Sequence, residues 1–345
     1  MVQRLQRLEQ IRGVAPALAA THNEAYAATP NYRPITAEEI LRKACLDHRL
    51  EQRLIYVWTR GTEVLAWCNV EPPSQANIGG DLYPYVGGEM VLQPSLIALH
   101  PDWRGCGLEA KLLTVAATDL AAGGKPAMQL ILSEEDQDAR ALYHEAGFRE
   151  IGRMVSLRAT LAQLQPDPRG VTTRRLRTEN LPQLLRLHNA AFAELCRLRG
   201  WQALSVEDLD LLRQSVTGYD DRGVLLAYRD GEPVGYVAAM VDPVFNEQHG
   251  DQDDRGDQDG RGGQNGRRAK RGWIGLAQLG LTVAPELYGQ GLGSGLMAAA
   301  LVYLAGRQMK EAELITDLQN HQAVAFYTAL GFEAVREWPV LEWRF

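Results

Sequence analysis

The chain has 345 residues, 46% of them hydrophobic and 23% charged, with a formal net charge of −7 at pH 7. This length and composition indicate a globular protein that is large enough for two domains with separate cores. The acidic balance argues against a nucleic-acid partner, because phosphate binding requires a basic surface. The four cysteines form no CxxC pair, and no uncharged apolar stretch reaches the length of a membrane span. We therefore expect a cytoplasmic protein without a disulfide framework, a metal, or a membrane partner.

Short sequence landmarks occur twice along the chain in the same order. Residues 22–26 (HNEAY) resemble residues 188–192 (HNAAF), and each set is followed by a hydroxyl residue, Thr36 or Ser205, with a carboxylate three positions later. This hydroxyl–carboxylate spacing is typical of a helix N-terminus. Further along, four pairs keep one constant separation: Pro101 and Pro285, Gly107 and Gly291, Tyr143 and Tyr327, Gly147 and Gly331. A fixed order with a single change of spacing indicates a duplicated domain with one insertion.

The change of spacing coincides with residues 249–272, which contain no apolar residue except Ala269. Such a segment buries too little surface to offset the entropy of ordering it, so we expect a disordered loop. Its acidic first half and basic end are consistent with an interaction tail or with a tolerated surface insertion. A short stretch with proline and glycine at 165–170 separates the copies. We therefore predict one domain over 1–165 and a second over 171–345.

Hydrophobic periodicity and turn residues define the expected elements of the second copy. In chain order we expect a strand at 173–177, helices at 181–197 and 206–214, a hairpin of 224–228 with 234–240, a strand at 273–283, a helix at 294–308, a strand at 312–316 and a helix at 323–330. The first copy has the same order. Strands interleaved with helices predict an α/β fold in which helices cover a mixed sheet.

A glycine-rich loop lies between the expected strand at 273–283 and the helix that follows it: Tyr288-Gly289-Gln290-Gly291-Leu292-Gly293-Ser294. A loop that leads into a helix presents unpaired N–H groups and the positive end of the helix dipole, which suit an anion. Glycines allow that backbone to approach a diphosphate closely. The loop is neither a P-loop nor a Rossmann fingerprint, and by itself it is equally consistent with a plain turn.

A second motif, Asn320-His-Gln-Ala-Val-Ala-Phe-Tyr327-Thr-Ala-Leu-Gly-Phe332, follows the loop at a distance of 27 residues. Together the two motifs resemble the GNAT superfamily of acyl-CoA N-acetyltransferases, and the resemblance covers both copies. It implies two GNAT domains in tandem, each with a mixed, mostly antiparallel sheet flanked by helices. It further implies transfer of an acetyl group from acetyl-CoA to a primary amine of a small molecule, by direct attack in a ternary complex. We expect no metal, and a monomer or homodimer.

The resemblance also implies roles for individual residues of the second copy. The loop from Tyr288 to Ser294 would hold the coenzyme A diphosphate, and Asn320 would hydrogen-bond the coenzyme. The backbone of Leu281, Thr282 and Val283 would pair with the pantetheine arm. Tyr327 would protonate the departing thiolate, which suits a thiol with a pKa near 8.5.

Both copies depart from the family pattern. Tyr288 stands where the family usually has Gln or Arg. In the first copy, Glu109 occupies the last Gly/Ala position of the loop, where a carboxylate would repel a diphosphate, and Asp136 replaces the asparagine. We therefore expect a weaker site there, either degenerate or binding the coenzyme without turnover, formed by Leu99, Arg104, Gly105, Gly107 and Tyr143.

The sequence assigns neither the general base nor the molecule that accepts the acetyl group. The strand at 273–283 has no carboxylate. Asp317, Glu194 and Asp208 are candidates, although surface or capping roles explain them better, and water is an alternative. The second copy also resembles the mycothiol synthases in residues 187–192 and Gly200-Trp201, but Ala277 and Gln278 stand where a glutamate is expected. Three alternatives follow: a mycothiol synthase-like enzyme, a peptide or protein amine acetyltransferase, and a non-catalytic acyl-CoA-binding sensor.

Overall fold

The computed structural model describes most of the chain outside several gaps. Within the part of the chain that it describes, no helix combines the length and apolar character needed to cross a membrane. The described residues are 2–27, 34–46, 51, 54–71, 76–79, 97–132, 137–164, 166–167, 171–199, 203–215, 218–241, 246, 269–275 and 279–345.

The first copy contains strands β1 to β7 and helices α1 to α4. In chain order its elements are β1 (Val2–Leu5), α1 (Leu8–Tyr26), α2 (Ala37–Leu46), β2 (Leu54–Arg60), β3 (Glu63–Glu71), β4 (Ala76–Gly79), β5 (Ala98–Leu99), η2 (Pro101–Trp103), α3 (Leu108–Ala122), β6 (Ala127–Ile131), α4 (Gln137–Glu145), β7 (Arg149–Thr160) and η3 (Leu161–Gln163).

The second copy repeats this order of elements. They are β8 (Thr172–Arg175), η4 (Thr178–Asn180), α5 (Leu181–Arg199), α6 (Val206–Ser215), η5 (Asp221–Gly223), β9 (Val224–Arg229), β10 (Glu232–Met240), β11 (Arg271–Ile274), β12 (Leu281–Val283), η6 (Pro285–Leu287), α8 (Leu292–Ala305), β13 (Glu311–Asp317), α9 (His321–Ala329) and β14 (Glu333–Arg344).

The single strand expected at 273–283 is wrong, because the structure has two strands there. β11 pairs with β13, whereas β12 pairs with β10, and Gly275 adopts a φ of 111° where β11 ends. Arg271 and Gly272, which the sequence places in the insertion, belong to β11, and the Arg271 side chain is buried. Residues 249–268 of the expected insertion, like 276–278, lie outside the described residues.

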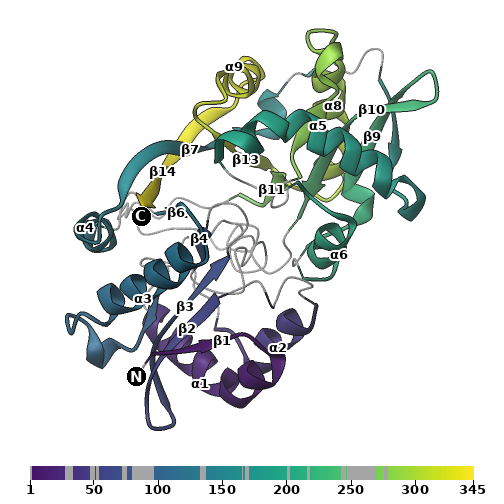
Figure 1. The fold of residues 1–345 in the computed structure, drawn as a ribbon. Coiled ribbons are helices and arrows are strands. Elements are labelled where there is room, and N and C mark those ends of the chain that lie inside the picture. Colours follow the sequence, from purple (N-terminus) through teal and green to yellow (C-terminus); the bar gives the residue numbers. More distant parts are fainter. Residues whose placement is uncertain are drawn as a thin grey trace, which may run out of the picture.

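The strands form one sheet that runs through both copies (Figure 1), in the order β1-β2-β3-β4-β6-β14-β7-β13-β11-β10-β9-β8. One short strand in each copy leaves this path, since β5 pairs with β3 and β12 with β10. Helices α1 and α2 cover one face of the first copy's sheet, and α3 and α4 cover the other. In the second copy, α5 and α6 cover one face of the sheet, and α8 and α9 cover the other. The predicted tandem α/β architecture is confirmed.

The repeated landmarks near the start of each copy hold the first two helices together. Asn189 on α5 donates from Nδ2 to the carbonyl of Leu204 at 2.9 Å and accepts the Leu204 N–H at 2.9 Å; Asn23 makes the same two bonds with Ile35. The expected N-caps are also present, because Thr36 pairs with Glu39, and Ser205 with Asp208, through their backbone N–H groups. These residues therefore stabilise the fold in both copies.

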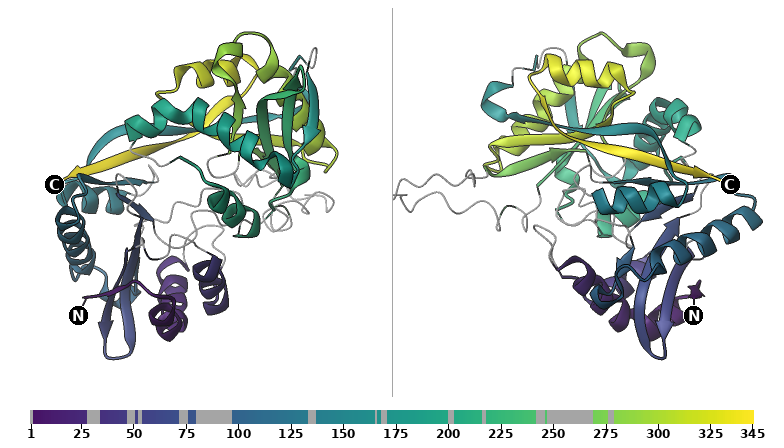
Figure 2. Two further views of the ribbon diagram at one scale, coloured as in Figure 1. Left: turned by 45° about the vertical axis from the view of Figure 1, so that its right-hand side comes forward. Right: turned by 90° about the vertical axis from the view of Figure 1, so that its left-hand side faces the viewer.

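The last strand of each copy completes the sheet of the other copy. β14 lies between β6 and β7, and β7 lies between β14 and β13, all antiparallel. Figure 2 shows these two long strands running side by side from one copy to the other. Neither strand was among the elements predicted from the sequence. Their local pattern is obscured by charged residues and, in β14, by Pro339.

Polar and charged side chains on the paired strands β7 and β13, and β14 and β6, are complementary in the exchanged arrangement. Arg158 on β7 faces Glu313 on β13, with a 2.9 Å ion pair, and Ser156 donates to the same carboxylate at 2.5 Å. At the equivalent place in the other copy, Glu342 on β14 accepts from Gln129 on β6 at 2.8 Å. If each strand instead paired within its own copy in the same register, the buried carboxylates of Glu342 and Glu313 would face each other. Two buried like charges are costly, so the sequence favours the exchange.

The exchange predicts that the two copies depend on each other to fold. We expect separate chains of residues 1–165 and 171–345 to be insoluble or partly unfolded alone, since each leaves a central strand edge uncovered. Mixed during refolding, they should form a 1:1 complex in size-exclusion chromatography. Arg158→Glu in the first fragment should weaken that complex by about 3 kcal/mol, because it sets one buried carboxylate against another. Two fragments that unfold cooperatively as independent monomers would contradict the exchange.

Candidate active site

The sheet of the second copy opens between β12 and β13. β12 pairs with β10 through Leu281–Val283, whereas β13 pairs with β11 only through residues 311–313. Among the residues that the structure describes, no strand occupies the other edge of β12 or the same side of β13 beyond residue 313. The backbone N–H and C=O groups of β12 on that edge are therefore able to pair with an extended ligand.

The glycine-rich loop lies directly after this open edge. Gly289 and Gly291 adopt φ angles of 76° and 80°, and a Cβ atom at either position would meet no atom within 4 Å. Gly291 is the N-cap of α8 and no side chain caps the helix, so the N–H groups of the first turn stay available. The loop therefore combines free donors, the positive end of a helix dipole and open space, which suit a diphosphate.

Side chains of the loop have neighbours that the sequence did not predict. Gln290 accepts from Arg229 at 2.7 Å, which places a cation from the end of β9 beside the loop. Ser294 Oγ accepts the backbone N–H of Asp167 at 2.7 Å, so its hydroxyl is tied to the segment between the copies. Tyr288 is 45% exposed, and partial burial together with Glu286 raises the pKa of its phenol.

Helix α9 carries the other two predicted site residues of the second copy. Asn320 is its N-cap, and its Oδ1 accepts the Ala323 N–H at 3.1 Å. Tyr327 is buried among the residues of the α8 face, with its ring 6.0 Å from that of Phe332. Burial raises the pKa of Tyr327 to about 12, so the phenol keeps its proton near neutral pH and is able to donate it. A Cβ at Gly293 would lie 3.3 Å from Phe326, which brings loop and helix into close contact.

The first copy reproduces the backbone of the site with different side chains. Its loop has the same left-handed glycines, Gly105 and Gly107, at φ 74° and 70°, and Leu99 lies in β5 on the equivalent open edge. Arg104 donates to the Ala25 carbonyl at 3.1 Å. Burial raises the pKa of Glu109, and the charge of Arg104 opposes that shift. Tyr143 is buried with its ring 5.2 Å from Phe148, and Asp136 lies outside the described residues.

The three carboxylates considered as a general base all have structural surroundings. Asp317 ends β13, where its Oδ1 accepts the Gln319 N–H at 2.8 Å. Asp208 caps α6, and Glu194 is an exposed residue 3.8 Å from Arg197.

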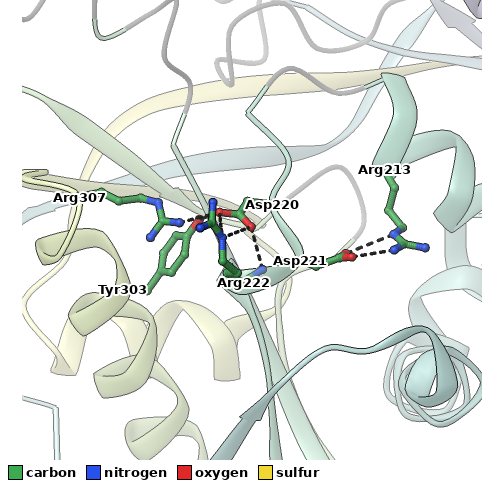
Figure 3. Close-up of polar contacts among 6 residues, drawn as sticks. All are labelled: Arg213, Asp220, Asp221, Arg222, Tyr303 and Arg307. Carbon is green, nitrogen blue, oxygen red and sulfur yellow. Dashed lines mark hydrogen bonds and ion pairs between the residues drawn. The ribbon is translucent and has the colours of Figure 1, made fainter.

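Two adjacent aspartates at the start of β9 anchor the helices that flank this sheet (Figure 3). Asp220 binds side chains of η5 and of the end of α8, and Asp221 binds α6 through a 2.7 Å ion pair. Although burial raises the pKa of Asp220, hydrogen bonds from its arginine neighbours lower it to about 2, so the carboxylate stays charged. The side chains involved are those of Arg213, Asp220, Asp221, Arg222, Tyr303 and Arg307.

A buried pair that sequence reasoning did not assign to the site lies on the other face of the sheet. His188 Nδ1 is 2.7 Å from the Tyr236 hydroxyl, and burial lowers the pKa of His188 to about 4. The sequence has a histidine at this place in both copies, His22 and His188. One difference between the copies could have revealed this pair in the sequence. The first copy has Trp67 where the second has Tyr236, whose hydroxyl lies beside His188.

His188 predicts a particular loss of stability in acid. Because its pKa is lower in the folded chain than the usual 6.5, the unfolded chain binds the extra proton as the pH falls from about 6.5 towards 4. This stabilisation is complete above pH 6.5, and about 3 kcal/mol should be lost across that window. Urea unfolding at several pH values should give a shallower dependence for His188→Asn than for the wild type. An identical dependence in both proteins would rule out His188 as its source.

Comparisons with known proteins agree with this geometry. A family model described as the acetyltransferase (GNAT) family matches residues 18–148 and 182–332. The chain therefore belongs to the GNAT acetyltransferase family and carries the domain twice. This membership supports an acyltransferase that transfers acetyl groups.

Curated relatives point to one group within the family. The chain is 30% identical to a mycothiol acetyltransferase from Nocardioides sp. over 246 residues, which are 68% of this chain and 75% of the relative. It is 29% identical to the mycothiol acetyltransferase of Acidothermus cellulolyticus over 285 residues, 81% of this chain and 78% of the relative. The resemblance to mycothiol synthases seen in the sequence is thus confirmed as a similarity.

Solved structures share the fold over the whole chain. A tandem GNAT protein from the clavulanic acid biosynthesis pathway aligns with a TM-score of 0.62 at 14% identity, covering 100% of this chain and 98% of that one. A GCN5-related N-acetyltransferase from Sphaerobacter thermophilus aligns with a TM-score of 0.59 at 19% identity, covering 99% and 95%. At these identities the likeness concerns the fold alone.

Proposed function

We propose that the chain is an acetyl-CoA-dependent N-acetyltransferase whose second copy transfers acetyl to a primary amine of a small molecule. The observation that carries this proposal is the open edge of β12, which an uncapped glycine loop follows and whose Val283 shares a core cluster with a buried, protonated tyrosine, Tyr327. Those three features are what a thioester coenzyme requires: anion contacts for its diphosphate, backbone contacts for its pantetheine arm and a proton for its leaving thiolate.

The residues of the second copy would divide the binding of acetyl-CoA among them. The N–H groups from Gly289 to Ser294 take the diphosphate, and the free edge of Leu281–Val283 pairs with the pantetheine amides. Asn320, whose oxygen caps α9, keeps its amide nitrogen for the coenzyme. Arg229 adds the positive charge that Tyr288 does not supply.

Transfer proceeds by direct attack of the amine nitrogen on the thioester carbonyl. The new C–N bond forms as the C–S bond breaks, Tyr327 gives its proton to the departing sulfur, and the surplus proton of the nitrogen passes to water. The name of the curated relatives, mycothiol acetyltransferase, supports a small acceptor over a peptide. The first copy, in which Glu109 stands beside Arg104, serves as the weaker or non-catalytic partner.

Removing the proton donor tests the chemical role of Tyr327. Tyr327→Phe should lower kcat about 10²-fold and leave the KM for acetyl-CoA nearly unchanged, because a general acid acts in the transition state. The assay measures release of coenzyme A thiol with a panel of small primary amines. Tyr303→Phe, which removes a hydroxyl bound to Asp220 at 3.2 Å, is the control and should retain kcat.

Two outcomes would argue against the proposal in different ways. An unchanged kcat in Tyr327→Phe would remove the tyrosine from the chemistry. No thiol release with any amine, despite tight acetyl-CoA binding by the wild type, would favour a sensor; acetylation of a peptide but not of small amines would favour a protein acetyltransferase.

The inequality of the copies is tested by placing the same charge in both loops. Gly107 and Gly291 share nearly the same φ and open surroundings, so Gly107→Glu and Gly291→Glu should have similar backbone costs. Gly291→Glu should weaken acetyl-CoA binding at least tenfold by repelling the diphosphate, whereas Gly107→Glu should change it less than twofold. Isothermal titration calorimetry measures both, with the two Gly→Ala variants as uncharged controls. Equal losses would refute the ranking.

A further inference from the structure

Three polar side chains lie in a row on the face of the second copy's sheet that α5 covers. His188 on α5, Tyr236 on β10 and Thr282 on β12 have exposed fractions of 2%, 0% and 3%. His188 Nδ1 lies 2.7 Å from the Tyr236 hydroxyl, and Tyr236 is directly opposite Thr282 in the β10–β12 pairing. The three residues therefore connect helix α5 with strand β12, whose other edge is open.

The first copy has the same backbone here but none of the hydroxyl groups. His22, Trp67 and Ala98 occupy the equivalent positions, and Trp67 is directly opposite Ala98 in the β3–β5 pairing, as Tyr236 is opposite Thr282. The Trp67 indole donates to the Leu18 carbonyl at 3.1 Å, so it is satisfied within the first copy. Because both copies adopt one fold, the fold does not require a hydroxyl at either place. The second copy has gained two of them beside its open strand edge.

The Thr282 hydroxyl has unused hydrogen-bonding capacity. Its Oγ1 is buried and makes no hydrogen bond within the described part of the chain. Leu281 and Val283, on either side, face α8, so Thr282 faces α5 on the opposite side of the sheet. A buried hydroxyl without a partner is costly, which indicates that a ligand completes its bonding.

The protonation states of His188 and Tyr236 define which of them donates the hydrogen bond and which accepts it. Burial lowers the pKa of His188 to about 4, so its imidazole is neutral and Nδ1 is able to accept. Burial raises the pKa of the Tyr236 phenol, with the neighbouring Thr282 hydroxyl opposing the shift, so this phenol keeps its proton. Tyr236 is then able to donate to His188. The Thr282 hydroxyl beside it keeps its lone pairs as acceptors.

We propose that the Thr282 hydroxyl accepts a hydrogen bond from the N–H of the acceptor amine, with Tyr236 and His188 as positioning residues behind it. This inference rests on the proposed function and deepens it. A neutral, oriented acceptor binds an amine N–H and turns the nitrogen lone pair towards the thioester without removing a proton. It therefore explains how the second copy can orient an amine without a carboxylate at this place.

A bisubstrate ligand tests this contact without requiring turnover. The probe is coenzyme A whose sulfur is joined through a –CH2–C(=O)– link to the α-nitrogen of S-methylcysteine amide, so that an N–H remains at the acceptor position. The wild type should bind it more tightly than acetyl-CoA. Thr282→Val should lose about five- to tenfold in affinity for the bisubstrate, the effect of one neutral hydrogen bond, and keep its affinity for acetyl-CoA. Thr282→Ser, which retains the hydroxyl, should restore most of the loss.

Variants behind Thr282 test the positioning role. Tyr236→Phe and His188→Leu should each reduce affinity for the bisubstrate severalfold without affecting acetyl-CoA, and His188→Asn, whose carboxamide reaches the place of Nδ1, should lose less than His188→Leu. Tyr56→Phe is the matched control, since it removes a fully buried hydroxyl that donates to Asp119 at 3.1 Å in the first copy. It should leave both affinities unchanged.

The outcomes separate this inference from the proposed function. If the bisubstrate binds the wild type no better than acetyl-CoA, or if Thr282→Val weakens both ligands equally, the contact is refuted. If the wild type prefers the bisubstrate through Thr282 but releases no thiol with any amine, acetyl transfer fails while the contact stands. Transfer that is unaffected in Thr282→Val would leave the proposed function intact and remove Thr282 from the site.

Discussion

The divergence of β12 from β13 is the constraint on which the rest of the second copy depends. A sheet that continued regularly would satisfy the backbone of β12 on both edges and leave nothing for a ligand. Here β11 supplies the neighbour of β13, Gly275 follows it, and β12 returns to β10 alone. The uncovered edge lies directly before the glycine loop, and Val283 of this strand shares a core cluster with Tyr327. The edge is open because one segment of the chain changes its pairing partner.

A gap in a sheet requires rigid neighbours, and the strand exchange supplies one of them. β13 borders the opening, and its other edge is covered by β7 from the first copy. The charges of Arg158, Glu313 and the buried Arg271 connect β7, β13 and β11 across that edge. The first copy therefore supports the site of the second directly, whatever its own loop binds. This gives a physical reason for a chain to keep a copy whose loop carries Glu109.

Features encoded by local spacing were predictable from the sequence, whereas features that depend on distant pairing were not. The helix caps at Thr36 and Ser205 and the strand–loop–helix order around Gly291 follow from residues close together in the sequence, and the duplication follows from the recurrence of such short landmarks. The exchange of β7 and β14 did not, because the match of Arg158 with Glu313 that favours it can be recognised only when the strand register is known. The row from His188 to Thr282 was missed for the same reason: Tyr236 resembles any core aromatic until α5 is packed on β10.

The two copies differ in a consistent direction at equivalent positions. Where the second has Gly293 against Phe326, the first has Glu109 and the smaller Leu142. Where the second has Tyr236 and Thr282, the first has Trp67 and Ala98, which bury apolar surface and leave no hydroxyl for a ligand. At the β10–β12 pairing the first copy therefore has only apolar contacts, whereas the second has a buried hydroxyl without a partner. Because such a hydroxyl costs stability, the proposed ligand contact at Thr282 gives a reason for the second copy to keep it.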